Sequence, residues 1–356
     1  LQPLARTLRA ATGGNPAVLS EVLFDLFDRG SIRFVDDGLS FAAIDAAALG
    51  APSAILEARA GRLPADASHA LAVLLAGGGA LERSVLFEEG EVEPHGFAVL
   101  REMGWASGPD RAGLIRLRGD LPRSLARFPP PSQAICGALA DALVARGAPP
   151  ESRASLLFQA GRGREGVAAA LAGAERLRAA HASGRAATLL RDALAASGME
   201  PNLRLALAEV HLAAGEPLAA VEALSPFALP NSFSTGVRAT AARALGEARA
   251  LLGMTEEALR SLAEARSLLP APSPSERLRR IRAEAYVHFK RGAFQEAESV
   301  LREAVRDATG VEKERLRLAI AAQQLSRGHL EGVREVLEEI VVRLREAGNE
   351  VGTAQA

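Results

Sequence analysis

A set of recurring glycines in the second half of the chain constrains its fold more than any other feature. Gly215, Gly253, Gly292 and Gly328 are 38, 39 and 36 residues apart. A small residue precedes each glycine by seven positions, and an alanine or valine and then a leucine follow it by five and nine. The four copies are Ala208, Gly215, Ala220 and Leu224; Gly246, Gly253, Ala258 and Leu262; Ala285, Gly292, Ala297 and Leu301; and Ala321, Gly328, Val333 and Leu337. Spacing this regular indicates a repeat array.

The spacing within each copy predicts a hairpin of two helices. The glycine suits the left-handed conformation that follows the first helix, and the small residues let the two backbones approach closely. A degenerate earlier copy has Ala174, Ala186, Leu190 and Ala193, with His181 in the position of the glycine. One hairpin cannot bury its own apolar face, so the copies are expected to stack into a curved superhelix. An irregular helical bundle is the alternative.

The hairpins resemble tetratricopeptide repeats, which favour small residues at these positions. Repeats of that family have about 34 residues, so the longer periods here imply longer loops, at Pro226–Ser234 and Pro270–Ser275. The resemblance implies an α-solenoid that binds a protein or peptide on its concave face. Binding residues of such repeats usually come from the first helix of each hairpin. The candidates are Arg204, His211, Arg249, Arg282 and His288.

Some of these candidates have a plainer interpretation. His211 and His288 occupy the same repeat position, where an aromatic residue is common, so packing is the alternative role for both. Arg282 belongs to a basic cluster at the start of a repeat helix, together with Arg277, Arg279 and Arg280. Such a cluster either binds an acidic partner or forms a solvated face.

Composition and charge exclude several classes of protein. The chain has 356 residues, enough for two or three domains, and a formal net charge of −1. A charge this small creates no field for nucleic acid or acidic lipid. No apolar run reaches the roughly eighteen residues of a membrane span. Cys136 is the single cysteine, so neither a disulfide framework nor a thiolate metal site is expected, and a cytoplasmic setting is predicted.

The first third of the chain is organised differently. Asn15 and Pro16 suit the start of a helix, which is expected to run to Gly30 and to precede a β-hairpin around Asp36–Gly38. Helices and then two short apolar stretches are expected at 53–62, 65–75, 82–87, 93–103, 105–106 and 114–117. Helices followed by a β-wing are the order of a winged-helix domain. Pro129–Pro131 predicts a domain boundary after it.

Three segments resemble parts of bacterial STAND-class regulators, an AAA-type group of signalling ATPases. The segments are TGGNPAVLSEVLFDLFDRGSI for the helical lid, RLPADASHALAVLLAGGGALERSVL for the helices after it and LIRLRGDLPRSL for the second wing strand. In the last segment Arg118 and Gly119 stand where relatives frequently have histidine. The resemblance covers essentially the whole chain. It implies lid helices and a β-hairpin over 1–50, a degenerate winged helix over 51–128 and a repeat superhelix over 129–356.

The lid segment contains one candidate ligand-binding motif, Gly14-Asn15-Pro16. In the resembled class, Gly-x-Pro lies against the adenine of a nucleotide held by the preceding core. The resemblance therefore implies that Gly14, Asn15 and Pro16 contact ATP or ADP in a longer parent protein. The alternative is that Gly14 ends one helix and Pro16 begins the next. Because the chain begins at Leu1 rather than methionine, we expect it to be a piece of such a parent.

No reaction centre and no cofactor are expected within this chain. A phosphate-binding loop needs Gly-x-x-x-x-Gly-Lys-Ser/Thr, and neither Lys290 nor Lys313 has that setting. The histidines do not have metal-ligand spacing, and Cys136 occupies an apolar helix position. An enzyme that uses 129–160 as a cleft has no supporting set of residues.

Direct nucleic-acid binding is not expected either. The recognition helix of the expected winged helix, 93–103, carries Glu93 and Glu102 against Arg101 alone. Phosphate contacts need lysine or arginine at such positions. The winged helix is therefore expected to act as a structural hinge.

Two functions are consistent with these features. The first is a non-catalytic sensor and scaffold arm of a larger ATP-dependent signalling or transcription regulator. Its superhelix would bind a protein or inducer, and its lid and winged helix would relay binding to an upstream nucleotide-binding core. The second is a free-standing tetratricopeptide-repeat adaptor between proteins.

Overall fold

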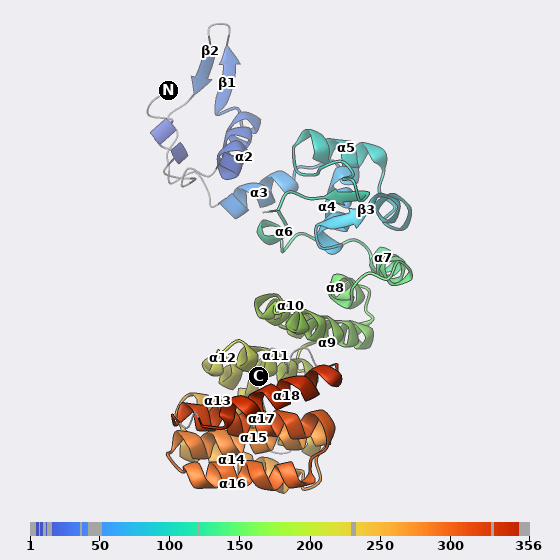
Figure 1. Cartoon of the computed structure of the whole chain (residues 1–356). Coiled ribbons are helices and arrows are strands. Elements are labelled where there is room, and N and C mark those ends of the chain that lie inside the picture. The colour runs from blue at the N-terminus through green and yellow to red at the C-terminus, as the bar shows by residue number, and fades with distance from the viewer. Residues whose placement is uncertain are drawn as a thin grey trace. The chain divides into compact units, whose positions relative to one another are not determined.

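The computed structural model describes residues 5–6, 8–9, 12, 16–35, 38–41, 52–119, 121–228, 233–328 and 331–348. The chain divides into two compact units, residues 1–170 and 171–356. Most described residues are helical and the strands are short (Figure 1), which confirms the mostly α-helical fold class. The division falls inside helix α9 (Gly163–Ala179). The domain ranges 1–50, 51–128 and 129–356 stay a prediction.

The first unit contains a helix with a β-hairpin, a winged-helix-like region and a further pair of helices. Strand β1 pairs antiparallel with β2, with Ile32 opposite Phe41, as the sequence predicts. Asp36 and Asp37 of the expected turn lie outside the described residues. The bounds are α2 (Pro16–Asp28), β1 (Ile32–Val35), β2 (Gly38–Phe41), α3 (Pro52–Ala60), α4 (Ala65–Ala76), β3 (Ala80–Glu82), the π-helix η2 (Val85–Glu89), α5 (Pro94–Glu102), β4 (Leu114–Arg116), α6 (Leu121–Ser124), α7 (Gln133–Ala145), the 3₁₀ helix η3 (Pro150–Ser152) and α8 (Ala154–Gln159).

The middle of this unit has the element order of a winged helix. β3 pairs antiparallel with β4, with Leu81 opposite Ile115, and a further bridge joins Ala106 to Leu117. The helix expected over 82–87 is displaced, because β3 occupies residues 80–82 and η2 occupies residues 85–89. The reason is tertiary: pairing with β4 places Leu81 beside Ile115 in the core, where both are buried.

Close packing of α4 on α5 holds this region together. A Cβ atom added at Gly96 of α5 would lie 2.4 Å from the carbonyl oxygen of Asp66 on α4. The two helix backbones are therefore in contact at this point, which only glycine permits. Leu71, Leu100 and Trp105 fill the space around them with no exposed surface.

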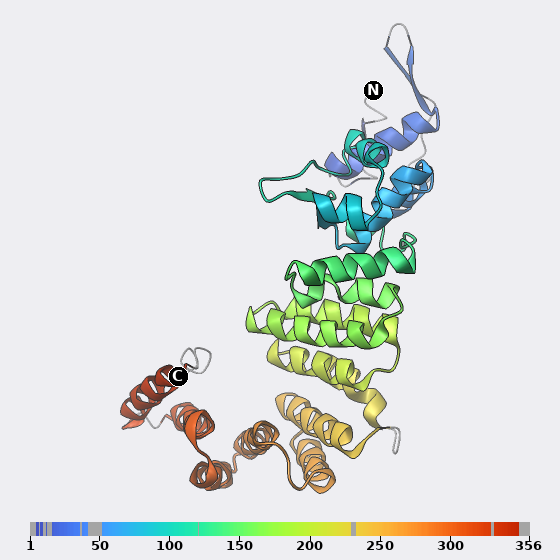
Figure 2. The same ribbon diagram turned by 90° about the vertical axis from the view of Figure 1, so that its right-hand side faces the viewer.

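The second unit is a row of helical hairpins. It begins within α9 and continues with α10 (Ser183–Ser197), α11 (Pro201–Ala213), α12 (Pro217–Leu224), the 3₁₀ helix η4 (Ser225–Ala228), α13 (Thr235–Leu251), α14 (Thr255–Leu268), α15 (Pro274–Lys290), α16 (Phe294–Asp307), α17 (Gly310–Ser326) and α18 (Val333–Glu346). Figure 2 shows the hairpins from α13 to α18 following one another along a curved row. The first helices of successive hairpins, α11, α13, α15 and α17, contact one another in turn.

The turn glycines of the repeat adopt the predicted left-handed conformation. The φ angle is +75° at Gly215, +79° at Gly253 and +78° at both Gly292 and Gly328. His181, which replaces the glycine in the earlier copy, has φ of +56°. A residue with a Cβ atom is disfavoured in this region, so the turn imposes the conformation on His181. These angles confirm the prediction that each glycine forms the turn between the two helices of its hairpin.

The small residues of the repeat lie where two helices meet. Ala208, Ala285 and Ala321 are all buried. At the equivalent position of α13, a Cβ atom added to Gly246 would lie 2.8 Å from Cγ of Leu262 on α14. The repeated leucine therefore occupies the space that the small residue leaves, and this explains why the two recur together.

Candidate ligand-binding groove

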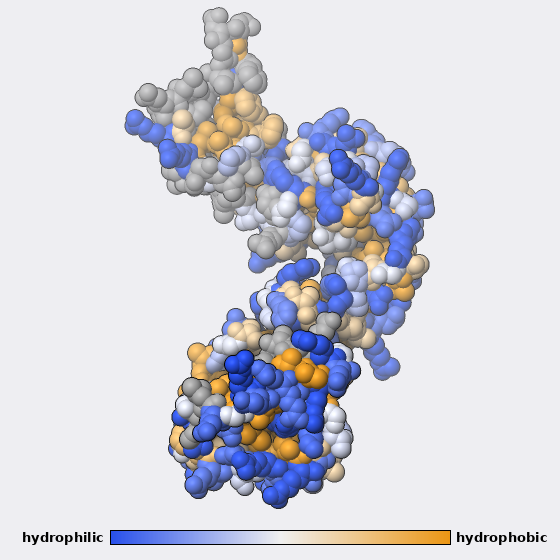
Figure 3. All heavy atoms as spheres, in the orientation of Figure 1, coloured by the Kyte–Doolittle hydropathy of each residue, from blue (hydrophilic) through white to orange (hydrophobic). Residues whose placement is uncertain are grey.

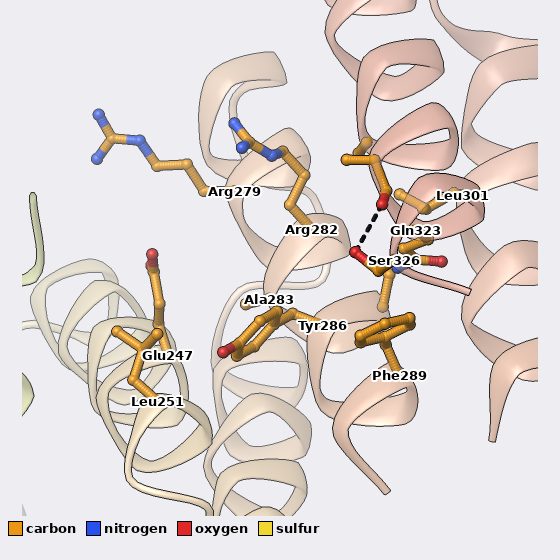
Figure 4. Close-up of a pocket in the computed structure, with 13 residues that line it drawn as sticks. Glu247, Leu251, Arg279, Arg282, Ala283, Tyr286, Phe289, Leu301, Gln323 and Ser326 are labelled. Carbon is orange, nitrogen blue, oxygen red and sulfur yellow. Dashed lines mark hydrogen bonds between the residues drawn. The ribbon is translucent and has the colours of Figure 1, made fainter. Parts of the chain in front are cut away.

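A groove of about 400 Å³ crosses the first helices of three successive hairpins. We call it the α15 groove, since α15 forms its floor and α13 and α17 flank it. Its principal lining residues are Glu247, Leu251, Arg279, Arg282, Tyr286, Phe289, Gln323 and Ser326 (Figure 4). The volume falls in the range of about 300–1,000 Å³ that is typical of small-molecule sites.

Helical periodicity brings these side chains together. On α15, Arg282 and Tyr286 are four residues apart and Phe289 follows three later, so all three share one face. On α17, Gln323 and Ser326 share a face for the same reason. The two helices pack against each other, so the aromatic rings and the amide of Gln323 line the same space.

A buried arginine contacts three carboxylates on the α13 side of the groove. Arg243 of α13 has no exposed side-chain surface. It donates to Glu247 at 2.9 Å, to Glu276 of α15 at 2.8 Å and to Glu209 of α11. Burial opposes its charge, but the three carboxylates raise the pKa of Arg243 above its ordinary value. Burial raises the pKa of Glu247, while Arg243 opposes that rise.

Arg282 differs from the other groove charges because no carboxylate pairs with it. Arg279 lies 3.2 Å from Glu209, whereas Arg282 forms no hydrogen bond or ion pair with any residue that the structure describes. Burial lowers the pKa of the Arg282 guanidinium, Glu247 opposes this and the nearby charge of Arg315 lowers it further. An arginine remains charged despite such shifts, so the exposed Arg282 places a positive charge at the groove with no hydrogen-bonded carboxylate among the described residues, and Glu247 is the carboxylate whose charge acts on it.

Of the five residues expected to bind a partner, the structure places Arg282 in the α15 groove and the others elsewhere. Arg249 donates at 2.6 Å to Ser261 Oγ on α14, within its own hairpin. His211 is buried, and its Nδ1 lies 2.6 Å from a carboxylate oxygen of Glu216 in the following turn. The remaining two are Arg204 and His288, for which the described residues supply no hydrogen-bond partner to the buried Nε atom and the buried Nδ1 atom respectively. Partner binding by all five stays a prediction.

Sequence reasoning missed the aromatic floor of the groove. Tyr286 and Phe289 are half-buried, and the Lys290 ammonium lies 5.3 Å from the centroid of the Tyr286 ring. The sequence shows that Tyr286 and Phe289 follow Arg282 at helical spacing, which places the three side chains on one face of α15. It did not distinguish a groove from a packed face, because the contribution of α17 depends on how the hairpins stack.

A second arrangement of charges joins α2 to the winged-helix-like region within the first unit. Glu21 of α2 is 3% exposed. Its carboxylate accepts hydrogen bonds from Arg59 of α3, from Trp105 Nε1 at 3.2 Å and from Arg118 Nη1 at 2.6 Å. We call these four residues the Glu21 junction. Asp25, one turn later, accepts from Arg62 at 2.6 Å.

The expected adenine-contact motif is described only in part. Gly14 and Asn15 lie outside the described residues. Pro16 is the first residue of α2, as the structural interpretation of the motif requires, and is exposed. Contact with a nucleotide stays a prediction.

The structure offers no further chemistry in the ranges it describes. Those residues include no group of three or more His, Cys, Asp or Glu side chains that could hold a metal ion. Nor do they include a helix that is both long and apolar enough to cross a membrane. Cys136 is buried. On the visible face of the repeat unit, small apolar patches alternate with charged residues (Figure 3).

Comparisons with known proteins give a distant structural likeness. No protein-family model matches the sequence, and no curated protein matches it. The chain is similar to the crystal structure of a Signal Transduction ATPase with Numerous Domains (STAND) protein with a tetratricopeptide repeat sensor, from Pyrococcus horikoshii. The match has a TM-score of 0.47 and 12% identity over 97% of this chain and 51% of that one. The chain thus spans about half the length of that protein, and a likeness at this level carries no argument about activity.

Proposed function

We propose that this chain is the non-catalytic sensor arm of a larger ATP-dependent signalling or transcription regulator of the STAND class. Its repeat unit binds a protein or an inducer in the α15 groove, and the lid and winged-helix regions pass the event to a nucleotide-binding core in the same protein. Gly14, Asn15 and Pro16 contact the adenine of ATP or ADP there, and the whole acts in the cytoplasm.

The observation that carries this proposal is the α15 groove itself. The groove combines charged and aromatic side chains from successive hairpins, and on its α13 side the buried Arg243 contacts three carboxylates. Arg282 instead remains unpaired among the described residues, beside the half-buried rings of Tyr286 and Phe289. A mostly apolar recess with a few polar groups directed into it is the usual form of a binding site.

The Glu21 junction supports the relay. A buried carboxylate that holds donors from three separate segments fixes them in one arrangement, because moving α2 away would break buried ion pairs. Rigid elements joined through such contacts move as bodies rather than deform. The lid and the winged-helix region are therefore suited to transmit a change in position.

The test uses the intact gene product. The coding region upstream should specify a Gly-x-x-x-x-Gly-Lys-Ser/Thr loop, and the intact protein should bind and hydrolyse ATP. Arg282→Gln in the groove and Glu21→Gln in the junction should each change the rate of hydrolysis. Arg260→Gln on α14, whose side chain is 76% exposed, is the matched control and should leave the rate unchanged. An intact protein without a nucleotide-binding core would refute the proposal.

A free-standing adaptor is the second candidate, favoured by the stacked repeats alone. It requires that the isolated chain bind a partner protein without any nucleotide. An adaptor would retain full partner affinity after Glu21→Gln, because nothing has to be relayed through the junction. The sensor arm would lose coupling while its groove still binds.

A further inference from the structure

We infer that the α15 groove binds a small organic anion, with a carboxylate or phosphate held by Arg282 and Arg315 and an apolar ring placed against Tyr286 and Phe289. This inference rests on the proposed function and specifies the class of inducer that the sensor arm recognises. The sequence does not distinguish a protein partner from a small-molecule inducer, and this inference selects the small molecule.

The first argument is the position of two arginines, Arg282 in the groove and Arg315 beside it. Arg315 on α17 lies one turn before Ala319, which lines the groove, and therefore projects from the same face of that helix. Like Arg282, it forms no hydrogen bond or ion pair with any residue in the described parts of the chain. The two guanidinium groups are close enough for the charge of one to lower the pKa of the other.

The second argument concerns the acids nearby, each of which already contacts Arg243. Glu247 is the one carboxylate that lines the groove, and Arg243 binds it at 2.9 Å. Glu209 and Glu276 also bind Arg243. Each of the three carboxylates therefore already contacts Arg243, and Glu209 also lies 3.2 Å from Arg279. An anion that enters the groove would relieve the repulsion between Arg282 and Arg315 without competing against an existing ion pair.

The third argument is the shape and character of the site. A groove of about 400 Å³ accommodates a single small molecule better than a folded segment of a partner. Guanidinium groups bind the paired oxygens of carboxylate and phosphate in a two-pronged geometry. Tyr286 and Phe289 then offer ring surfaces for the apolar part of the ligand. Recognition of this kind requires both the charge and the ring.

Tyr286 makes the test specific to the groove, because it is the single tyrosine in the chain. The full chain is prepared with ¹³C-labelled tyrosine, and the ring resonances are followed by NMR. Four probes are titrated: phenyl phosphate, 3-phenylpropionate, the uncharged 3-phenylpropanamide and inorganic phosphate. The two aromatic anions should shift the Tyr286 resonances in a saturable manner. The uncharged amide and inorganic phosphate should bind at least about tenfold more weakly, since each lacks half of the recognition.

Variants then assign the charge contribution. Arg282→Gln and Arg315→Gln should each weaken binding of the aromatic anions by about ten- to a hundredfold, the range for a lost charged hydrogen bond. Arg282→Lys keeps the charge but not the two-pronged geometry, so an intermediate loss is expected. Arg260→Gln should bind as the wild type does. Circular dichroism confirms that each variant keeps its helices.

The possible results either support the inference or overturn it. A preference for phosphate over carboxylate, or the reverse, identifies the anionic group and supports the inference in either case. Equal binding of 3-phenylpropanamide, or undiminished binding in both arginine variants, would overturn it. So would the absence of any saturable shift. If ATP hydrolysis by the intact protein still responds to Arg282→Gln while no anion binds, the sensor role stands and only the ligand class fails.

Discussion

Arg118 donates a hydrogen bond from Nη1 to Oε1 of Glu21 at 2.6 Å, across 97 residues of sequence. The guanidinium of Arg118 thereby holds helix α2. Arg59 and Trp105 bind the same carboxylate. The attachment of α2 to the winged-helix region therefore depends on a buried charge as well as on apolar packing by Val22 and Leu26.

Glu21→Gln should release α2 from this attachment. The change removes the negative charge that the guanidinium of Arg59, which is 7% exposed, contacts on Glu21, and a broken buried pair costs about 3–5 kcal/mol. Hydrogen exchange measured by mass spectrometry should show faster exchange across Pro16–Asp28. Ser20→Ala, on the exposed side of the same helix, should leave exchange unchanged. Equal protection in Glu21→Gln and wild type would contradict the role assigned to the junction.

Arg243→Met should strongly destabilise the repeat unit. The substitution fills a similar volume but leaves Glu209, Glu247 and Glu276 without the cation that they surround, and removal of one member of a buried ionic cluster costs about 3–5 kcal/mol. The free energy of unfolding is measured by urea denaturation followed by circular dichroism. Arg260→Met on the exposed side of α14 should change it by no more than about 0.5 kcal/mol. If Arg243→Met lowered the free energy of unfolding by no more than Arg260→Met does, the ionic cluster would not be needed for stability.

Two glycines of the same helix should respond in opposite ways to alanine. At Gly246 the added Cβ would lie 2.8 Å from Leu262 Cγ and 3.2 Å from the Ala258 carbonyl oxygen, so Gly246→Ala should cost about 1–3 kcal/mol through overpacking. At Gly236 nothing lies within 4 Å of the added atom, so Gly236→Ala should be neutral or stabilise the helix by up to about 1 kcal/mol. Thermal unfolding distinguishes the two, and a similar midpoint for both variants would exclude tight packing at Gly246.

Glu247→Gln should change how stability depends on pH. Burial raises the pKa of Glu247 in the folded chain above its ordinary value of 4.5, so the folded chain keeps this proton to a higher pH than the unfolded chain does. Ionisation of Glu247 therefore costs stability as the pH rises above 4.5. The variant lacks this cost, and its free energy of unfolding should rise relative to that of the wild type from pH 4.5 upward.

Glu165→Gln should change the pH dependence of stability in the opposite direction. Hydrogen bonding to Arg162 lowers the pKa of Glu165, so its contribution to stability is present above the ordinary value of 4.5 and is lost as the pH falls below it. The variant should therefore lose stability relative to the wild type as the pH rises. Parallel curves for Glu247→Gln and Glu165→Gln in urea titrations at several pH values would refute both assignments.

The sequence by itself determined the hairpins of the repeat. Gly215 and Gly253 end helices because the left-handed turn is a local requirement. Ala208 and Gly246 are small because the second helix of the hairpin must pack against the first, as Leu262 does at Gly246. Each of these positions lies within nine residues of a turn glycine, at the same interval in every copy. Periodicity therefore reveals them without any knowledge of the folded molecule.

Only the tertiary structure decided where the charges meet. Arg249 and Arg282 both lie on first helices of hairpins, yet one binds Ser261 within its hairpin and the other faces the α15 groove. Glu21 and Arg118 are joined across the first unit. These positions depend on how helices stack, because an ion pair or a groove needs side chains from elements that are far apart in sequence. The spacing along a single helix does not encode that arrangement.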